Sequence, residues 1–243
     1  MKEELRKAAI AAVAGASILG AGGAEALKPE ELHINASPSK VHEFIYKSSL
    51  AGGDRKEAYA VSYRINNTWY SAVAMGGLWG IPEPVVKGVL AKLDAASGRK
   101  EGDRVFVYTY HNHSAELIMS HLAGLFDRSE IAAPNELALG PSGADCLKNE
   151  KVFVGDLPQI NIIIEPKITW VCGSHAESKR DNDISALRNN LGVATQKPNV
   201  NFDELVMVFE QEYKLISGVS VTHLSPNPTD DEIISAGRTV LGR

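Results

Sequence analysis

The hydrophobic and polar positions of this chain change their spacing several times, and each change marks a predicted element. From residue 57 to residue 63 larger side chains at the odd positions alternate with Ala or Ser at the even positions, which is the period of two of a strand. The Asn66-Asn67 pair that follows can adopt the positive φ of a tight turn. Residues 57–65 and 68–74 are therefore predicted to form a β-hairpin. Apolar residues then recur at helical spacing over residues 85–96, which predicts an amphipathic helix.

Further strands and another helix are predicted in the middle of the chain. Residues 105–110 are β-branched or aromatic throughout, which predicts a buried strand. Residues 114–126 return to helical spacing, and Ser114 is a suitable N-cap for that helix. Two more strands are predicted over residues 159–165 and 168–172, with a proline between them. This mixture of strands and helices indicates layered α/β packing.

The remaining parts of the chain are predicted to be mainly helical. A helix capped by Ser39 is expected over residues 39–49. Residues 177–183 are charged and read as a linker, an amphipathic helix is expected around residues 202–209, and a capping box beginning at Thr229 opens a last helix. We therefore expect three parts, namely an N-terminal segment (1–38), a core (39–176) and a helical C-terminal extension (177–243).

The N-terminal segment contains a soft apolar run whose role stays open. Residues 8–24 are rich in Ala, Gly, Val and Ile, and Ala24-Glu25-Ala26 has the small-x-small form of a signal cleavage site. Glu3 and Glu4 argue against a signal peptide, and the run is too short and Gly-rich for a membrane span. A helix packed on the surface or on a partner is favoured over membrane contact. A cytoplasmic location is slightly favoured, and export stays open.

Composition excludes several classes of protein. Of 243 residues, 44% are hydrophobic and 23% charged, which is ordinary for a globular chain with a real core. The formal net charge of −5 offers no basic field for a phosphate backbone, so we do not expect a nucleic-acid partner. Cys146 and Cys172 are the two cysteines, and neither belongs to a CxxC pair. We expect both to be buried free thiols rather than ligands or a bridge.

The candidate chemistry begins at the end of the strand over residues 105–110. Side chains on a strand alternate between faces, so His111 and His113 point the same way and can share a metal. Catalytic zinc takes three protein ligands, and the nearest acidic residue at a predicted helix start is Asp145. A base for a metal-activated water should be a carboxylate on a rigid neighbour, which suits Glu57. Glu43, in a predicted helix, is the alternative base.

Together these residues resemble the JAMM (MPN-type) zinc metalloproteases, a family with many bacterial and phage members. The matching motifs are Glu57, His111-Asn112-His113 and Ser142-Gly143-Ala144-Asp145, in the family's order and within about residues 41–173. The resemblance implies a three-layer α/β/α core with a mixed sheet, similar to cytidine deaminases. It also implies zinc ligation by His111, His113 and Asp145, with Glu57 as general base and Ser142 as oxyanion donor. The implied substrate is a protein or peptide, possibly isopeptide-linked.

Three departures from the family pattern and two alternative functions accompany this resemblance. Asn112 stands where the family usually has Ser or Thr, and Ser114 stands where a proline often follows the second histidine. The spacing from His113 to Ser142 is longer than usual, so we expect a helical insertion over residues 114–133 that borders the cleft. Ser142 to Asp145 is also a plain capping box. The alternative functions are a catalytically silent MPN-type scaffold and a hydrolase of small amides.

Overall fold

The computed structural model describes most of the chain outside its N-terminal part. The described residues are 32–50, 57–75, 83–100, 103, 105–123, 138–146, 158–174, 180–197 and 200–242. The predictions for residues 1–31, for residues 124–133 of the expected insertion and for residues 177–179 of the expected linker lie outside them. Within the described residues, no helix is both long enough and apolar enough to cross a membrane.

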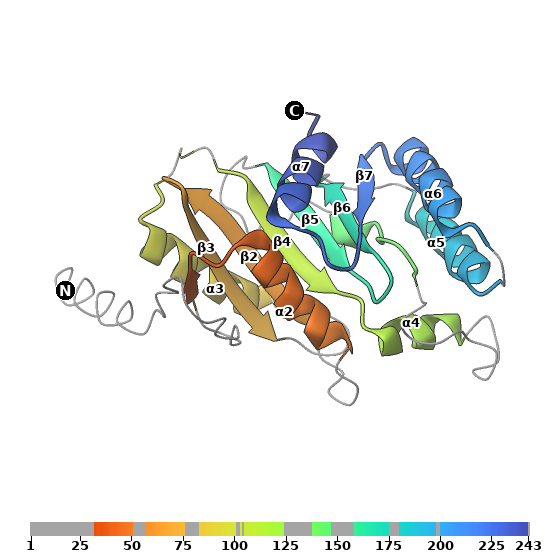
Figure 1. Cartoon of the computed structure of the whole chain (residues 1–243), viewed down its shortest axis with the longest axis horizontal. Helices are drawn as coiled ribbons and strands as arrows, with labels where there is room; N and C mark the ends of the chain where they lie inside the picture. Colours follow the sequence, from red (N-terminus) through yellow and green to blue (C-terminus); the bar gives the residue numbers. More distant parts are fainter. Residues whose placement is uncertain are drawn as a thin grey trace.

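Seven strands form one mixed sheet in the order β1-β3-β2-β4-β5-β6-β7 (Figure 1). The strands are β1 (Leu32–Ile34), β2 (Ala58–Ile65), β3 (Thr68–Met75), β4 (Val107–Asn112), β5 (Gln159–Ile164), β6 (Thr169–Gly173) and β7 (Val221–Leu224). Strands β4 and β5 pair in parallel, whereas the other neighbouring strands pair antiparallel. The predicted mixed sheet is confirmed.

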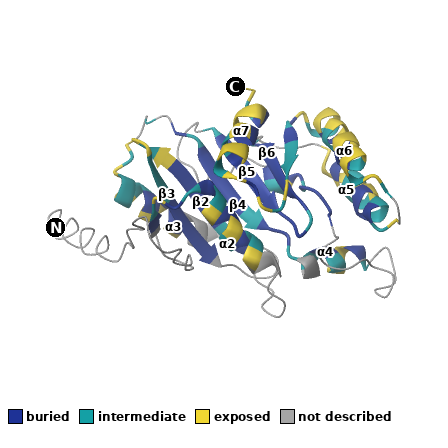
Figure 2. Cartoon of the chain, in the orientation of Figure 1, coloured by how far each residue is buried: buried dark blue, intermediate teal, exposed yellow. Residues whose placement is uncertain are grey.

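Helices cover both faces of this sheet. The described residues contain α2 (Pro38–Leu50), α3 (Glu83–Ser97), α4 (Ala115–Leu122), α5 (Asp181–Thr195), α6 (Phe202–Ser217), α7 (Asp230–Val240) and the short 3-10 helix η3 (Ala144–Cys146). Helices α2 and α7 pack on the face that carries Tyr110 and Ile162. Helices α5 and α6 pack on the opposite face, against Ile163 and Trp170. Figure 2 shows the sheet buried between helices whose outer sides are exposed. The layered α/β packing expected from the sequence is confirmed.

Several predicted elements are confirmed in detail. Strands β2 and β3 form the expected hairpin, and Asn66 and Asn67 have φ values of 49° and 66° in its turn. Ser114 caps α4 by accepting a hydrogen bond from the backbone N–H of Leu117. The capping box at Thr229 opens α7. Local sequence signals therefore determine these boundaries.

Strand β4 lies two residues further along the chain than predicted. It covers Val107–Asn112 rather than residues 105–110. Its pairing with β2 reaches His111, and its pairing with β5 reaches Asn112. Since the neighbouring strands continue the ladder, His111 belongs to the strand itself, which fixes the direction of its side chain.

The C-terminal part of the chain is more than the helical extension that the sequence suggested. Strand β7 pairs with β6 and forms an edge of the sheet. Helix α5 begins at Asp181, inside the stretch predicted to be a linker. A four-residue strand is too short to show a periodic pattern, and the charged start of α5 conceals its apolar stripe of Ile184, Leu187 and Leu191.

The prediction of two free thiols is wrong. Cys146 and Cys172 form a disulfide that joins η3 to β6, with their Cα atoms 6.0 Å apart. Their sequence separation of 26 residues gives no hint of this proximity, which arises only when η3 folds against the sheet. The bridge fixes the residue that follows Asp145 to the central part of the fold.

Candidate metal centre

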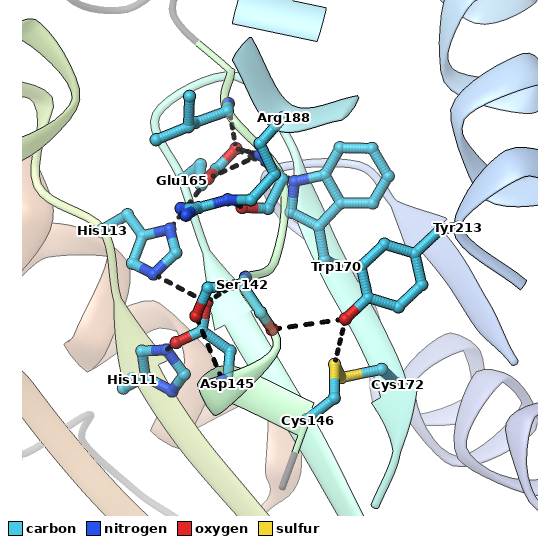
Figure 3. A network of polar contacts seen from close by, with 12 residues as sticks. His111, His113, Ser142, Asp145, Cys146, Glu165, Trp170, Cys172, Arg188 and Tyr213 are labelled. Carbon is cyan, nitrogen blue, oxygen red and sulfur yellow. Dashed lines mark hydrogen bonds and ion pairs between the residues drawn. A yellow bond between two sulfur atoms is a disulfide. The ribbon is translucent and has the colours of Figure 1, made fainter. Parts of the chain in front are cut away.

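Strand β4 and helix η3 bring the three predicted metal ligands together. The backbone N–H of His113 donates to the carbonyl of Ile164 at 2.9 Å, so the parallel pairing continues one residue past β4. This keeps the side chains of His111 and His113 on the same face of the sheet. Their Nε2 atoms lie 3.2 and 3.3 Å from the carboxylate oxygens of Asp145 (Figure 3). The potential ligand atoms of all three residues lie within 4.8 Å of one another.

The donor set and its spacing suit a divalent transition metal. Two imidazole nitrogens and one carboxylate oxygen are typical ligands of a zinc site that keeps an open position. The carboxylate of Asp145 contacts both imidazoles, since Oδ1 lies 3.2 Å from Nε2 of His111 and Oδ2 lies 3.3 Å from Nε2 of His113. The group of His111, His113 and Asp145 can therefore hold a metal ion.

Behind His113 lies a carboxylate that the sequence analysis missed. Glu165 is 0% exposed, and its Oε1 lies 2.9 Å from Nδ1 of His113. The carboxylate also accepts hydrogen bonds from the backbone N–H groups of Leu139 and Gly140 and from the indole of Trp170. Donation from Nδ1 to Glu165 leaves Nε2 of His113 directed at Asp145, which is the usual way a ligand histidine is oriented.

The charges of this group depend on one another. Burial disfavours the charged form of His113, but the carboxylates of Asp145 and Glu165 outweigh it and raise its pKa to about 9. Burial likewise opposes ionisation of Asp145, but His113 and His111 hold its pKa well below the ordinary value. For Glu165, the hydrogen bond and charge of His113 also outweigh burial and lower the pKa. In the metal-free protein, protons therefore compete with a metal for His113.

Glu57 lines the same cleft as His113 and Asp145. It immediately precedes β2, and Tyr59 pairs with His111, so Glu57 is aligned with the end of β4. Burial raises the pKa of Glu57, the positive charges of His111 and His113 lower it in part, and Asp145 raises it again. A carboxylate with a raised pKa is suited to accept a proton near neutral pH.

Asn112 has a structural role next to this glutamate. Its Oδ1 accepts a hydrogen bond of 2.6 Å from the backbone N–H of Ala58, the residue after Glu57. The asparagine that departs from the JAMM pattern therefore ties the start of β2 to the end of β4.

Glu43, the alternative base, pairs with Lys47 on α2 and has an exposed side chain (57%). Because α2 packs on the sheet face opposite to His111, Glu43 does not belong to this site.

The loop before η3 completes the site. Glu57, His113, Ser142 and Asp145 line one cleft of about 670 Å³. Ser142 caps η3, because its hydroxyl accepts from the backbone N–H of Asp145 while its own N–H donates to the Asp145 carboxylate. The structure thus brings both predicted catalytic residues beside the predicted ligands. His121 also lines the cleft from α4, where it is exposed.

Side chains of α5 and α6 hold this loop in place. Gly140 has φ +85°, and a Cβ there would lie 2.6 Å from the Phe209 ring, so only glycine fits. Its carbonyl accepts a hydrogen bond of 2.8 Å from Nε of Arg188. The hydroxyl of Tyr213 donates to the carbonyl of Ser142 at 3.2 Å. No pattern in the sequence points to Arg188 or Tyr213, because only the packing of α5 and α6 brings them here.

A signal for Glu165 was present in the sequence. This glutamate directly follows the six residues of β5, all of them buried. A carboxylate that ends such a run is rarely buried without partners, so it would have been a reasonable candidate for an orienting residue.

No protein family, curated protein or solved structure matches this chain in comparisons of its sequence and its fold. The class of this protein is therefore described from its fold and its candidate site alone. It is a mixed α/β protein with a His-His-Asp group that can bind a metal ion.

Proposed function

We propose that the chain is a zinc-dependent hydrolase of the JAMM (MPN) type that cleaves a peptide or isopeptide bond. One observation carries the proposal: Glu57 lines the same cleft as two of the three potential ligands, although β2, β4 and η3 are far apart in sequence. A base, a three-ligand metal group and a hydroxyl donor around one cleft are what metal-assisted hydrolysis of an amide requires.

The residues of the cleft divide the chemistry among them. Zinc held by His111, His113 and Asp145 would supply a Lewis acid for the substrate carbonyl and lower the pKa of a bound water. Glu57 takes a proton from the attacking water and delivers it to the leaving nitrogen. The hydroxyl of Ser142 donates a hydrogen bond to the carbonyl oxygen as negative charge develops on it.

The three-layer JAMM core is part of the same proposal. Helices on both faces of a mixed sheet, with the histidines at the end of a central strand, support it. The long spacing between His113 and Ser142 is occupied in part by α4, whose Leu117 and His121 line the cleft. This position supports the expectation that the inserted segment borders the substrate.

Zinc analysis and cleavage assays test the proposal. Protein loaded with zinc and freed of excess metal should contain about one zinc per chain, lost on His111→Ala, His113→Ala or Asp145→Ala. Glu57→Gln should keep the zinc and reduce turnover of a peptide or isopeptide substrate by roughly two to four orders of magnitude. Ser142→Ala should also keep the zinc and reduce turnover by roughly 10- to 1000-fold.

Glu43→Gln is the matched control, because it makes the same change on the opposite face of the sheet. It should leave both zinc content and turnover unchanged. Full activity of Glu57→Gln would overturn the assignment of the base, and absence of stoichiometric zinc would overturn the metal site. Zinc binding without cleavage of any peptide, isopeptide or small amide would favour the silent scaffold instead.

A further inference from the structure

Arg188 is a cation in the cleft for which the proposed reaction has no use. It belongs to α5, is partly buried, and lines the cleft together with Glu57 and Ser142. Figure 3 shows its side chain extending toward His113 and Glu165. A long cationic side chain directed into a cleft, rather than into solvent, indicates a role in that cleft.

Most of the hydrogen-bonding capacity of this guanidinium is unused. Its Nε donates to the carbonyl of Gly140 at 2.8 Å. Within the described residues this is its one hydrogen bond, and no carboxylate forms an ion pair with it. The two terminal nitrogens of Arg188 thus keep their donors, while the bond from Nε fixes the plane of the group. An oriented guanidinium of this kind is suited to bidentate recognition of a carboxylate.

We propose that Arg188 binds a carboxylate of the substrate beside the scissile bond, an inference that rests on the proposed hydrolase function. The substrate class is then a peptide or isopeptide with a carboxylate close to the cleaved amide. That carboxylate is either the C-terminal α-carboxylate, as in the release of a terminal residue, or the side chain of an Asp or Glu.

The cleft brings Arg188 close to the candidate metal group. Arg188, His113 and Asp145 line the same cleft, which has a volume of about 670 Å³. A carboxylate bound to Arg188 would therefore share this cleft with an amide held at His113 and Asp145.

A purely structural role for Arg188 makes a different prediction. If the side chain only holds the carbonyl of Gly140, its loss would weaken cleavage or binding of every substrate equally. A carboxylate site instead requires that the loss depend on the charge of the substrate. Paired substrates that differ in one carboxylate separate the two roles.

The experiment uses the zinc-loaded full chain and two pairs of peptides. The first pair ends in a free acid or an amide, and the second carries Glu or Gln next to the cleaved bond with an amidated C-terminus. The wild type should prefer one acid over its neutral partner by about 10- to 100-fold in kcat/KM, since charge-assisted hydrogen bonds are lost in the neutral peptide. The pair that shows the preference identifies the source of the carboxylate.

Arg188→Gln should abolish that preference, so that kcat/KM for the acid peptide falls to the value for its neutral partner, whatever loss both peptides share from the missing hydrogen bond to Gly140. Arg188→Lys should retain part of it, because the charge remains but the planar fork is lost. Arg180→Gln is the matched control, since Arg180 lies at the start of the same helix and pairs with Asp183 at the surface. Equal treatment of acid and neutral peptides by the wild type would overturn the proposal, even if cleavage itself supports the hydrolase.

A binding measurement keeps the test valid if no peptide is cleaved. Calorimetry with zinc-loaded Glu57→Gln should give a lower Kd for the acid peptide than for its neutral partner. The difference should vanish in the double variant with Arg188→Gln. If both peptides bind Glu57→Gln equally, or neither binds it, the carboxylate site is wrong. Charge-dependent binding without turnover in the wild type would support the site and contradict the proposed hydrolase.

Discussion

The buried carboxylate of Glu165 satisfies four donors at once, so its replacement by glutamine should affect both folding and metal binding. Oε1 accepts from His113 and from the backbone of Gly140, at 2.9 and 3.1 Å. Oε2 accepts from the backbone of Leu139 and from the indole of Trp170, both at 2.9 Å. Glutamine is nearly the same size, but one of its two terminal atoms is an NH₂ group that cannot accept. The N–H of Gly140 lies within 3.3 Å of both oxygens, so an NH₂ group at the Oε1 position leaves one donor facing a donor, and an NH₂ group at the Oε2 position leaves two.

The size of the effect follows from this count. A buried donor left without a partner costs about 1 to 3 kcal/mol, so one or two of them should lower the free energy of unfolding of Glu165→Gln by about 1 to 6 kcal/mol. Loss of the charge behind a ligand histidine should also weaken zinc binding by about 10- to 100-fold. Both effects arise from the same contacts around His113 and the loop at Gly140.

Two measurements check this prediction. Urea unfolding of the metal-free protein gives the change in stability, and competition with a chromophoric chelator gives the zinc affinity of the folded protein. Glu43→Gln is the control, because its exposed pair with Lys47 contributes at most about 0.5 kcal/mol. If Glu165→Gln kept the stability of the wild type and bound zinc within about threefold of it, Glu165 would not be the orienting residue.

Two further predictions concern contacts outside the ligand group. Replacing both cysteines, by Cys146→Ser and Cys172→Ser, should lower the free energy of unfolding by about 3.5 kcal/mol, which is the value expected for a closed loop of 26 residues. An unchanged midpoint of urea unfolding would contradict this prediction. Burial lowers the pKa of His42 to about 4, whereas the ordinary histidine value of 6.5 applies to the unfolded chain. The unfolded chain thus binds more protons between these values, and stability should fall by up to about 3 kcal/mol as the pH drops from 6.5 to 4. In denaturation curves recorded between pH 6.5 and 4, the stability of His42→Gln should fall less steeply than that of the wild type. An equally steep fall would show that other groups cause the loss of stability.

The elements that the sequence predicted correctly are those with a strong local pattern. The β2–β3 hairpin was predictable because larger side chains alternate with small ones along residues 57–63 and two asparagines accept the turn. Helix α7 was predictable because its capping box begins at Thr229. Both signals act over a few neighbouring residues, so no knowledge of distant parts of the chain was required.

Features that depend on distant segments could not be predicted in this way. The disulfide between Cys146 and Cys172 requires η3 to lie against β6, which neither local sequence shows. Strand β7 pairs with β6 through only four residues, and its edge position follows from the arrangement of the whole sheet. These features depend on tertiary contacts, and their local patterns are weak or absent.

The candidate site shows the same division between local and distant information. His111 and His113 were assigned to one face because strand alternation is a local rule. The partner of His113 was not found, since the donors around Glu165 come from the residue after β4, from the loop at Gly140 and from β6. The sequence thus identified the potential ligands but not the residues that orient them.

Helices α5 and α6, in the C-terminal part of the chain, hold the loop that contacts Glu165, the residue that orients His113. Nε of Arg188 on α5 holds the carbonyl of Gly140, and Tyr213 on α6 holds the carbonyl of Ser142. The N–H of Gly140 in turn donates to Glu165, which orients His113. One short loop therefore receives hydrogen bonds from α5 and α6 on its carbonyl side and donates to the site on its N–H side. Because these bonds share the loop, a disturbance of how α5 and α6 pack would reach the metal group through it.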